Sequence, residues 1–291
     1  MTTYHTIRVQ GVNVFYRQAG SAHAPTLVLL HGFPASSHMY EGLIRELAGH
    51  FHLVAPDFPG FGGSSSPSPD AFTYSFDQLA VVTEQFLQAL GLHRFSLYLQ
   101  DYGAPVGLRI ATKHPEWIEA LIVQNGNAYE EGLTSAFEPA RAFWRARTEV
   151  TEAAMTHLLT QEAITFAYTQ GTRHPEQINP DNFILDLWNL QRPGNRAAQL
   201  ELLYDYRTNL QRYPEWQAYF RQYQPPTLVV WGKHDPFFSP AGALAYQRDL
   251  HTIELVLLET GHFALEEDAA QIAALITRFL SASVTQAEVS S

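Results

Sequence analysis

The sequence of 291 residues contains no cysteine, few basic residues and no long apolar run. Without cysteine there is no disulfide framework, no thiolate nucleophile and no cysteine-based metal site. The 18 Lys and Arg residues stand against 29 Asp and Glu residues, which gives a formal net charge of -11. Nucleic acids and anionic membranes select basic surfaces, so neither is expected as a partner. No apolar run approaches the roughly 20 residues of a membrane-spanning helix.

The sequence does contain enough apolar residues for a large core. Hydrophobic residues make up 46% of the chain and charged residues 16%, which predicts a soluble globular protein. The first residues, Met1 to His5, lack the basic and then apolar pattern of an export signal. The cytoplasm is therefore the expected compartment.

The order of the short apolar runs predicts an α/β fold with a mostly parallel sheet flanked by helices. Alternating residues on both sides of a Gln10-Gly11 turn indicate an antiparallel hairpin. Helix-length segments separate the later runs, which is typical of parallel strands joined by right-handed crossovers. Ligands of such sheets bind beyond the carboxyl ends of the strands. The expected parallel strands are Thr26–Leu30, His52–Ala55, Phe95–Leu99, Leu121–Val123, Thr227–Trp231 and Ile253–Leu258.

The interval 127–223 interrupts this alternation, because it is rich in helix formers and aromatic residues and has no convincing buried strand. We expect it to form a helical cap inserted between the sixth and seventh strands, while residues 1–126 and 224–280 form the core. Residues 281–291 are small and polar and are expected to be a disordered tail. Prolines are expected to divide the cap into several helices, at Pro175, Pro180, Pro193 and Pro214.

A sharp turn is predicted between the strand Phe95–Leu99 and a helix that begins near Ala104. Such a turn pushes the side chain at its apex out of the sheet edge, and Gly103 allows the backbone to fold tightly enough. The apex residue is Asp101. A carboxylate at this position attacks an electrophilic carbon and becomes an ester, which predicts an enzyme that opens carbon–halogen or epoxide bonds.

The loop after the first long buried strand, His31-Gly32-Phe33-Pro34, lies where donors to an oxyanion are needed. We expect the backbone N–H groups of Phe33 and Tyr102 to donate to the Asp101 oxygen that bears charge when its ester is hydrolysed. The alternative interpretation of this loop is an ordinary turn at a strand end.

Two further strand ends offer an acid and a base. Asp235 follows the seventh strand and His262 follows the eighth, so the chain order is nucleophile, acid, histidine. The competing position for the acid, after the sixth strand, holds the uncharged Gln124-Asn125-Gly126. Asp235 is therefore the preferred partner of His262, with Glu130 and Glu131 as more distant candidates.

Together these motifs resemble the α/β-hydrolase superfamily, and more narrowly its branch with an aspartate nucleophile, which includes haloalkane dehalogenases, fluoroacetate dehalogenases and epoxide hydrolases. The resemblance implies that Asp101 forms an alkyl ester. It also implies that His262, oriented by Asp235, activates the water that hydrolyses this ester. The motifs that carry the resemblance are His31–Pro34, Asp57-Phe58-Pro59-Gly60-Phe61-Gly62-Gly63-Ser64, Gln100–Gly103, Asp235 and Gly261-His262.

The resemblance also indicates which cap residues contact the leaving group. Tyr206 resembles one of the two cap tyrosines of epoxide hydrolases, but Phe143-Trp144 stands where the first tyrosine is expected. Trp144 offers an N–H to a halide but cannot act as an acid. The sequence therefore favours hydrolytic dehalogenation, with epoxide hydrolysis as the alternative if Tyr168 supplies the second hydroxyl. A noncatalytic relative that binds a small molecule is the third hypothesis.

No metal ion or organic cofactor is implied by the sequence. The histidines show no ligand cluster, and Gly60-Phe61-Gly62-Gly63 lacks the Lys-Ser/Thr of a phosphate loop. The expected partners are water and a small apolar organohalide or epoxide. The sequence assigns no oligomeric state.

Overall fold

A single sheet of eight strands organises the computed structural model, which describes residues 1–289, with side chains described as far as residue 282. The strand order is β1-β2-β4-β3-β5-β6-β7-β8, with β1 and β2 antiparallel and β3 to β8 parallel. The predicted hairpin and the six predicted parallel strands are confirmed. The strands are β1 Thr3–Val9, β2 Val12–Ala19, β3 Thr26–Leu30, β4 His52–Pro56, β5 Phe95–Gln100, β6 Ile118–Gln124, β7 Thr227–Gly232 and β8 Ile253–Leu258.

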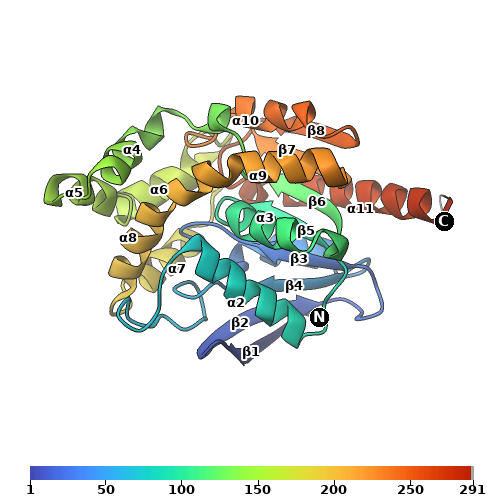
Figure 1. Cartoon of the computed structure of the whole chain (residues 1–291), viewed down its shortest axis with the longest axis horizontal. Coiled ribbons are helices and arrows are strands. Elements are labelled where there is room, and N and C mark those ends of the chain that lie inside the picture. The colour runs from blue at the N-terminus through green and yellow to red at the C-terminus, as the bar shows by residue number, and fades with distance from the viewer. Residues whose placement is uncertain (290–291) are drawn as a thin grey trace.

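Both faces of the sheet are buried, as the continuous apolar runs require. In β3, Leu27 and Leu29 point to one face and Val28 and Leu30 to the other, and all four are fully buried. Figure 1 shows α2 and α3 in front of the sheet and α11 behind it. The helices of the core are α1 Glu41–Leu47, α2 Phe76–Ala89, α3 Gly103–Lys113, α10 Pro240–Ala245 and α11 Leu265–Val289.

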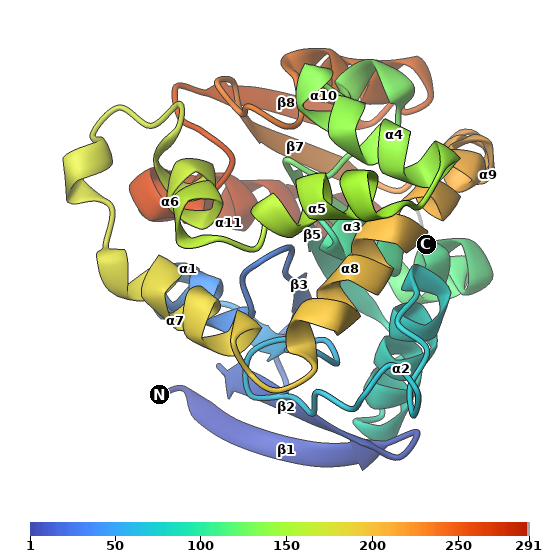
Figure 2. The ribbon, with the colours of Figure 1, turned by 90° about the vertical axis from the view of Figure 1, so that its left-hand side faces the viewer.

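The chain between β6 and β7 is helical, and its described residues include no strand. Figure 1 places α4, α5, α6 and α8 at one end of the sheet, and Figure 2, turned toward that end, shows these helices nearest the viewer with the sheet behind them. The helices of this insertion are α4 Glu138–Arg145, α5 Glu149–His157, α6 Gln161–Thr169, α7 Pro180–Leu190, α8 Asn195–Asp205 and α9 Arg207–Tyr223. Short 3-10 helices complete the chain, at η1 Ser37–Tyr40, η2 Pro115–Trp117, η3 Glu130–Gly132, η4 Ser135–Phe137, η5 Pro175–Gln177 and η6 Tyr246–Arg248.

Two details differ from the sequence-based expectations. Pro214 does not divide the insertion, because α9 continues through it. The buried side chains of Tyr213 and Trp216 hold the helix on both sides of this proline, so packing outweighs the lost backbone hydrogen bond. In the predicted tail, α11 extends to Val289, while residues 290–291 lie outside the described part of the chain. None of the described helices is long and apolar enough to span a membrane.

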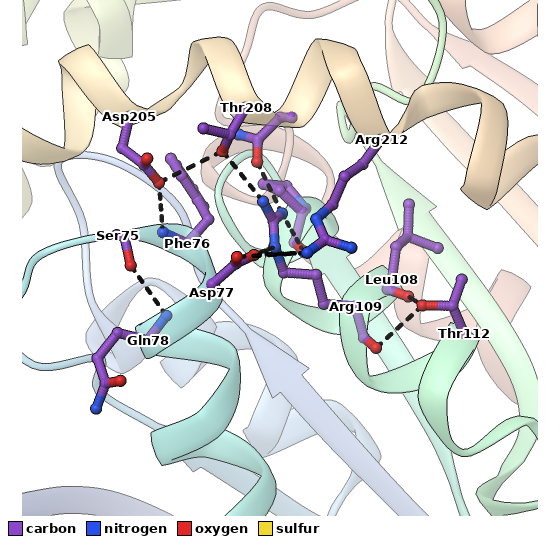
Figure 3. Close-up of polar contacts among 12 residues, drawn as sticks. Ser75, Phe76, Asp77, Gln78, Leu108, Arg109, Thr112, Asp205, Thr208 and Arg212 are labelled. Atoms are coloured by element: carbon purple, nitrogen blue, oxygen red, sulfur yellow. Dashed lines mark hydrogen bonds and ion pairs between the residues drawn. The ribbon is translucent and has the colours of Figure 1, made fainter.

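An arginine cluster ties the insertion to the core (Figure 3). The guanidinium of Arg109, on α3, donates to Asp77 of α2 at 2.6 Å and to Asn209 of α9 at 2.7 Å. Arg212 of α9 reaches the same Asp77 carboxylate. Arg109 is 7% exposed, so its charge depends on these partners. The cluster therefore fixes the start of α9 against two core helices.

The junction of α8 and α9 is held by a second contact in the same region (Figure 3). Asp205 accepts a 2.8 Å hydrogen bond from the backbone N–H of Phe76, the first residue of α2. A carboxylate at this position also interacts favourably with the dipole of α2. The next residue along the chain is Tyr206, whose ring packs edge-on against Phe76 of α2, with ring centroids 5.7 Å apart.

A buried ion pair attaches the other side of the insertion. His38 of η1 contacts Asp186 of α7 at 2.6 Å, and the hydroxyl of Tyr168, on α6, donates to the second oxygen of Asp186, also at 2.6 Å. Burial alone lowers the pKa of His38, but the adjacent Asp186 charge and its hydrogen bond outweigh burial and raise the pKa above its ordinary value. A protonated His38 therefore stabilises the contact between η1 and α7.

Replacing Arg109 with Met should lower the free energy of unfolding by about 2 kcal/mol, because hydrogen bonds to a charged group are lost from a buried site. Urea denaturation measures the change. The control is Arg94→Met, since Arg94 pairs with Glu119 on the surface and its side chain is 78% exposed. A surface pair contributes about 0–1 kcal/mol. Equal effects of the two substitutions would contradict a role of the Arg109 cluster in attaching α9.

The His38–Asp186 pair should make stability depend on pH. Because the pKa of His38 is raised in the folded protein, its contribution is complete below the unfolded pKa of about 6.5 and is lost as pH rises through the folded value. The difference in unfolding free energy between the wild type and His38→Gln should thus be larger at pH 6 than at pH 9.5. His23→Gln, at an exposed position, is the control. A difference that stays constant with pH would refute the contribution of a charged His38.

Candidate active site

The turn between β5 and α3 places Asp101 at its apex, with a backbone φ of 47°. This left-handed conformation is unfavourable for residues other than glycine. Small neighbours make the turn possible: a Cβ on Gly103 would overlap the carbonyl oxygen of Leu30, and a Cβ on Gly32 would overlap the side chain of Asp101. The side chain of Asp101 consequently projects from the sheet edge while remaining 8% exposed.

Two backbone N–H groups hold the Asp101 carboxylate. Phe33 donates to Oδ1 at 2.7 Å, and the N–H of Tyr102 also donates to the carboxylate. Burial raises the pKa of Asp101, and these donors together with His262 oppose the rise. The structure therefore brings both predicted oxyanion donors to the same carboxylate group. Oδ2 remains on the side of His262.

His262 lies between two carboxylates. Its Nδ1 is 2.7 Å from Oδ2 of Asp235, and its Nε2 is 3.9 Å from Oδ2 of Asp101. Burial lowers the pKa of His262, but the charges of Asp235 and Asp101 and the Asp235 hydrogen bond raise it above its ordinary value. With Nδ1–H donated to Asp235, Nε2 of the neutral ring is the acceptor, and it lies 3.1 Å from the Gln100 side-chain nitrogen and 3.9 Å from Oδ2 of Asp101. This arrangement suits a base acting on a water beside the Asp101 carboxyl group.

Asp235 is fixed by donors on both of its oxygens. Oδ1 accepts from the backbone N–H groups of Phe237, at 2.7 Å, and Phe238, at 3.1 Å. Oδ2 accepts from the side-chain amide of Asn125, at 2.7 Å, in addition to His262. These donors hold the Asp235 carboxylate in one orientation beside the imidazole.

Asn125 belongs to the site, although the sequence offered it only as part of an uncharged position that competes with Asp235. The residue lies at the end of β6 with a φ of 46°, and an asparagine before glycine at a strand end was the available signal. Glu130 and Glu131, the more distant candidates for the acid, are exposed, and Glu131 pairs with Arg248. The structure places neither glutamate in the site.

A largely apolar cavity of about 100 Å³ opens beside Asp101 and His262. Its walls come from the loop after β3, from η4 and from helices α4, α5, α6 and α8. No Lys or Arg occurs among the described residues that line it. The apolar lining includes Phe33, Phe137, Ala140, Met155, Leu158, Ile164, Ala167, Leu203, Phe237 and Phe238.

Trp144 and Tyr206 both line the cavity, with ring centroids 5.8 Å apart and planes inclined by 6°. The indole N–H of Trp144, however, donates to the backbone carbonyl of Leu203 at 2.8 Å. The prediction that this N–H faces a leaving group is therefore wrong for this conformation. The Leu203 carbonyl, near the end of α8, accepts this hydrogen bond. The Trp144 ring therefore contributes apolar surface to the cavity wall.

Two of the residues that line the cavity, Tyr102 and Tyr206, are tyrosines. The Tyr102 hydroxyl is buried and has no hydrogen-bond partner among the described residues. The Tyr206 hydroxyl interacts with that of Tyr213, which accepts from Asn127 at 3.1 Å. Burial, and to a lesser degree the Asp101 charge, raises the pKa of both Tyr102 and Tyr206. Both hydroxyls therefore keep their protons at neutral pH.

Tyr168 does not line the cavity, so the structure corrects its expected place beside the substrate. Its hydroxyl is committed to Asp186, and its ring stacks on Phe263 with centroids 4.0 Å apart. Phe263 follows His262 directly, so Tyr168 supports the histidine loop from α6. Phe143 is also buried away from the cavity, against Tyr204. Among the described residues, no group of three or more His, Cys, Asp or Glu side chains is arranged to hold a metal ion.

Comparison with known proteins identifies the family. A family model described as the alpha/beta hydrolase fold matches residues 25–269. The chain is 42% identical over 275 residues to an uncharacterized hydrolase of Saccharomyces cerevisiae, covering 93% of this chain and 94% of that protein. It is 27% identical over 274 residues to haloalkane dehalogenase 2 of Mycobacterium tuberculosis, covering 88% of each.

A solved structure of the epoxide hydrolase CorEH is similar with a TM-score of 0.77 and 20% identity, and the match covers 97% of this chain and 99% of that one. At this identity the likeness shows the fold alone. The family match extends over the strands that carry Asp101, Asp235 and His262. The chain is therefore a member of the alpha/beta hydrolase family.

Proposed function

We propose that this protein is an epoxide hydrolase in which Asp101 is the nucleophile, His262 the base and Asp235 the partner of the base. One observation carries the choice of epoxide. The Trp144 N–H is bonded to Leu203, whereas Tyr102 and Tyr206 line the cavity and burial keeps their hydroxyls protonated. An opening epoxide needs a proton or a strong hydrogen bond on its oxygen, which a phenol supplies and an indole does not.

In the first step, Oδ2 of Asp101 attacks an epoxide carbon. A carbon–oxygen bond to Asp101 forms, the ring carbon–oxygen bond breaks, and the ring oxygen takes a proton from Tyr206. In the neutral pair Tyr206 donates to Tyr213, whose hydroxyl also accepts from Asn127; once Tyr206 has lost its proton, the Tyr213 O–H turns to donate to it and stabilises the phenolate. The Tyr102 hydroxyl is a second donor to the same oxygen. Oδ1 of Asp101 stays with the Phe33 N–H throughout.

In the second step, His262 removes a proton from water, and the hydroxide adds to the Asp101 carbonyl carbon. The backbone N–H groups of Phe33 and Tyr102 stabilise the oxyanion. The tetrahedral intermediate then collapses and expels the alkoxide. The alkoxide takes the proton from His262 and leaves as a diol. The new Asp101 carboxylic acid returns a proton to Tyr206. The balance is one epoxide and one water consumed for each diol formed.

The cavity supports a small, apolar and uncharged substrate. Its volume of about 100 Å³ is below that of an engineered apolar cavity of roughly 150 Å³ that binds benzene. A carboxylated substrate would meet the charge of Asp101, with no Lys or Arg among the described lining residues to compensate. We further propose that residues 127–223 act as the cap that closes this cavity, since α4, α5, α6 and α8 supply one of its walls.

Carbon–halogen hydrolysis is the second candidate. The relative named haloalkane dehalogenase 2 aligns over 88% of this chain, and the same displacement by Asp101 would release a halide. This reaction needs no acid, so it does not use the proton of Tyr206. The two candidates consequently differ in the atoms that remain on the enzyme after the first step.

Trapping the ester tests the nucleophile and separates the candidates. His262→Gln should accumulate a covalent adduct, because the ester no longer meets activated water. With 1,2-epoxybutane, intact-mass spectrometry should show an increase equal to the whole epoxide. With 1-chlorobutane, any adduct should equal the substrate less hydrogen chloride. The double variant Asp101→Asn/His262→Gln, checked for deamidation, is the control. An adduct on this control, or none on His262→Gln with either substrate, would reject Asp101 as nucleophile.

The leaving-group donors are tested by comparing Tyr206→Phe with Trp144→Phe. Tyr206→Phe should slow the formation of the epoxide adduct by about 10²- to 10³-fold, the usual effect of removing one donor to a developing oxyanion. Trp144→Phe should have a smaller effect, because its N–H is bonded to Leu203 and the substitution keeps an aromatic wall. Rapid-quench kinetics on both substrates measures the rates. A silent Tyr206→Phe together with efficient halide release that depends on Trp144 would favour the dehalogenase instead.

A further inference from the structure

Gln100, the last residue of β5, lies directly behind the nucleophile and contacts the ring of His262. Its side chain is fully buried, and its Nε2 lies 3.1 Å from Nε2 of His262. The amide oxygen Oε1 is also buried and has no hydrogen-bond partner among the described residues. A buried carbonyl oxygen without a partner is unfavourable. One end of the Gln100 amide therefore contacts the base, and the other end lies buried without a partner among the described residues.

The contact is compatible with only one form of the imidazole. Because Nδ1 of His262 bonds to Asp235, Nε2 of the neutral ring is an acceptor and takes the N–H of Gln100. Once Nε2 is protonated, the ring presents an N–H there as well, and the two donors oppose each other. The imidazolium then needs an acceptor at the same place. The unpartnered Oε1 belongs to the same amide group.

We propose that the side-chain amide of Gln100 rotates with the protonation of His262, donating through Nε2 to the neutral ring and accepting through Oε1 from the imidazolium. A half-turn about the terminal torsion exchanges the two atoms in nearly the same volume. This torsion is broad and roughly two-fold in its preference. An amide is suited to both states because it carries a donor and an acceptor on one planar group.

The charges around His262 explain why a neutral partner fits here. Asp235 faces Nδ1 and Asp101 faces Nε2, while the rings of Phe237, Phe238 and Phe263 pack around the imidazole. A third carboxylate would hold His262 protonated and prevent it from accepting a proton from water. Gln100 supports both protonation states without adding charge. It is a positioning residue, since it acts through His262.

The catalytic consequence of this inference rests on the proposed function. When His262 takes a proton from water, the rotated amide stabilises the new imidazolium by a charge-assisted hydrogen bond. When the alkoxide removes that proton, the amide returns to the donor orientation. The rotation itself is independent of turnover and depends only on the titration of His262. It can thus be tested without any substrate.

The test is the titration of His262, followed by NMR of protein labelled at histidine nitrogen, with its signals assigned by comparison with His262→Gln. A hydrogen bond to a charged group is stronger than one to a neutral group, so a rotating amide raises the titration midpoint. Gln100→Met, which removes both amide atoms, should lower the midpoint by about 1 pH unit. The side-chain amide signal of Gln100 in the wild type should change with the same midpoint.

Gln124→Met is the matched control. Gln124 is the register neighbour of Gln100 on β6, is equally buried, and donates to the backbone carbonyl of His262 rather than to its ring. This substitution should leave the midpoint unchanged. An amide that only donates stabilises the neutral ring, so a higher midpoint in Gln100→Met would overturn the proposal, as would an unchanged midpoint or an equal shift in Gln124→Met. If His262 titrates as expected but neither substrate is turned over, the proposed function is rejected while the proposal for Gln100 stands.

Discussion

The left-handed backbone of Asp101 is the constraint on which the site depends. The residue is held at a φ of 47° between the end of β5 and the start of α3, and only the missing side chains of Gly32 and Gly103 allow the neighbouring segments to approach so closely. The strained turn presents the carboxylate to the Phe33 N–H on one side and to His262 on the other. A sheet with both faces buried supplies the rigidity that keeps this conformation in place.

The chemistry of the site also depends on the burial of its three ionisable side chains. Asp101, Asp235 and His262 are all buried, so their charges are stabilised by one another and by fixed donors rather than by water. Asp235 receives two backbone N–H groups and the Asn125 amide. Asp101 has fewer donors, and burial raises its pKa. The Asp235 carboxylate is thereby fixed by donors on both oxygens, whereas Asp101 is left poorly solvated, as suits a nucleophile.

The helical insertion takes part in the site through its attachments to the core. On one side, Asp205 caps α2 and precedes Tyr206. On the other, Asp186 connects His38 of the core to Tyr168, whose ring supports the loop of His262 through Phe263. Both attachments are polar and end next to residues of the site. A displacement of the insertion would therefore shift the cavity wall and the loop of His262 together.

The sequence alone determined the sheet and the positions of Asp101, Phe33, Asp235 and His262, because parallel strands place the residues after their carboxyl ends at one edge. Only the tertiary structure decided what the insertion contributes. The direction of the Trp144 N–H depends on a carbonyl 59 residues away, and Tyr168 turns to Asp186 rather than to the cavity. The partners of Gln100 and Asn125 also come from other parts of the chain. Local patterns encode strands, turns and helices, whereas the orientation of a side chain between packed helices is set by contacts that are distant in sequence.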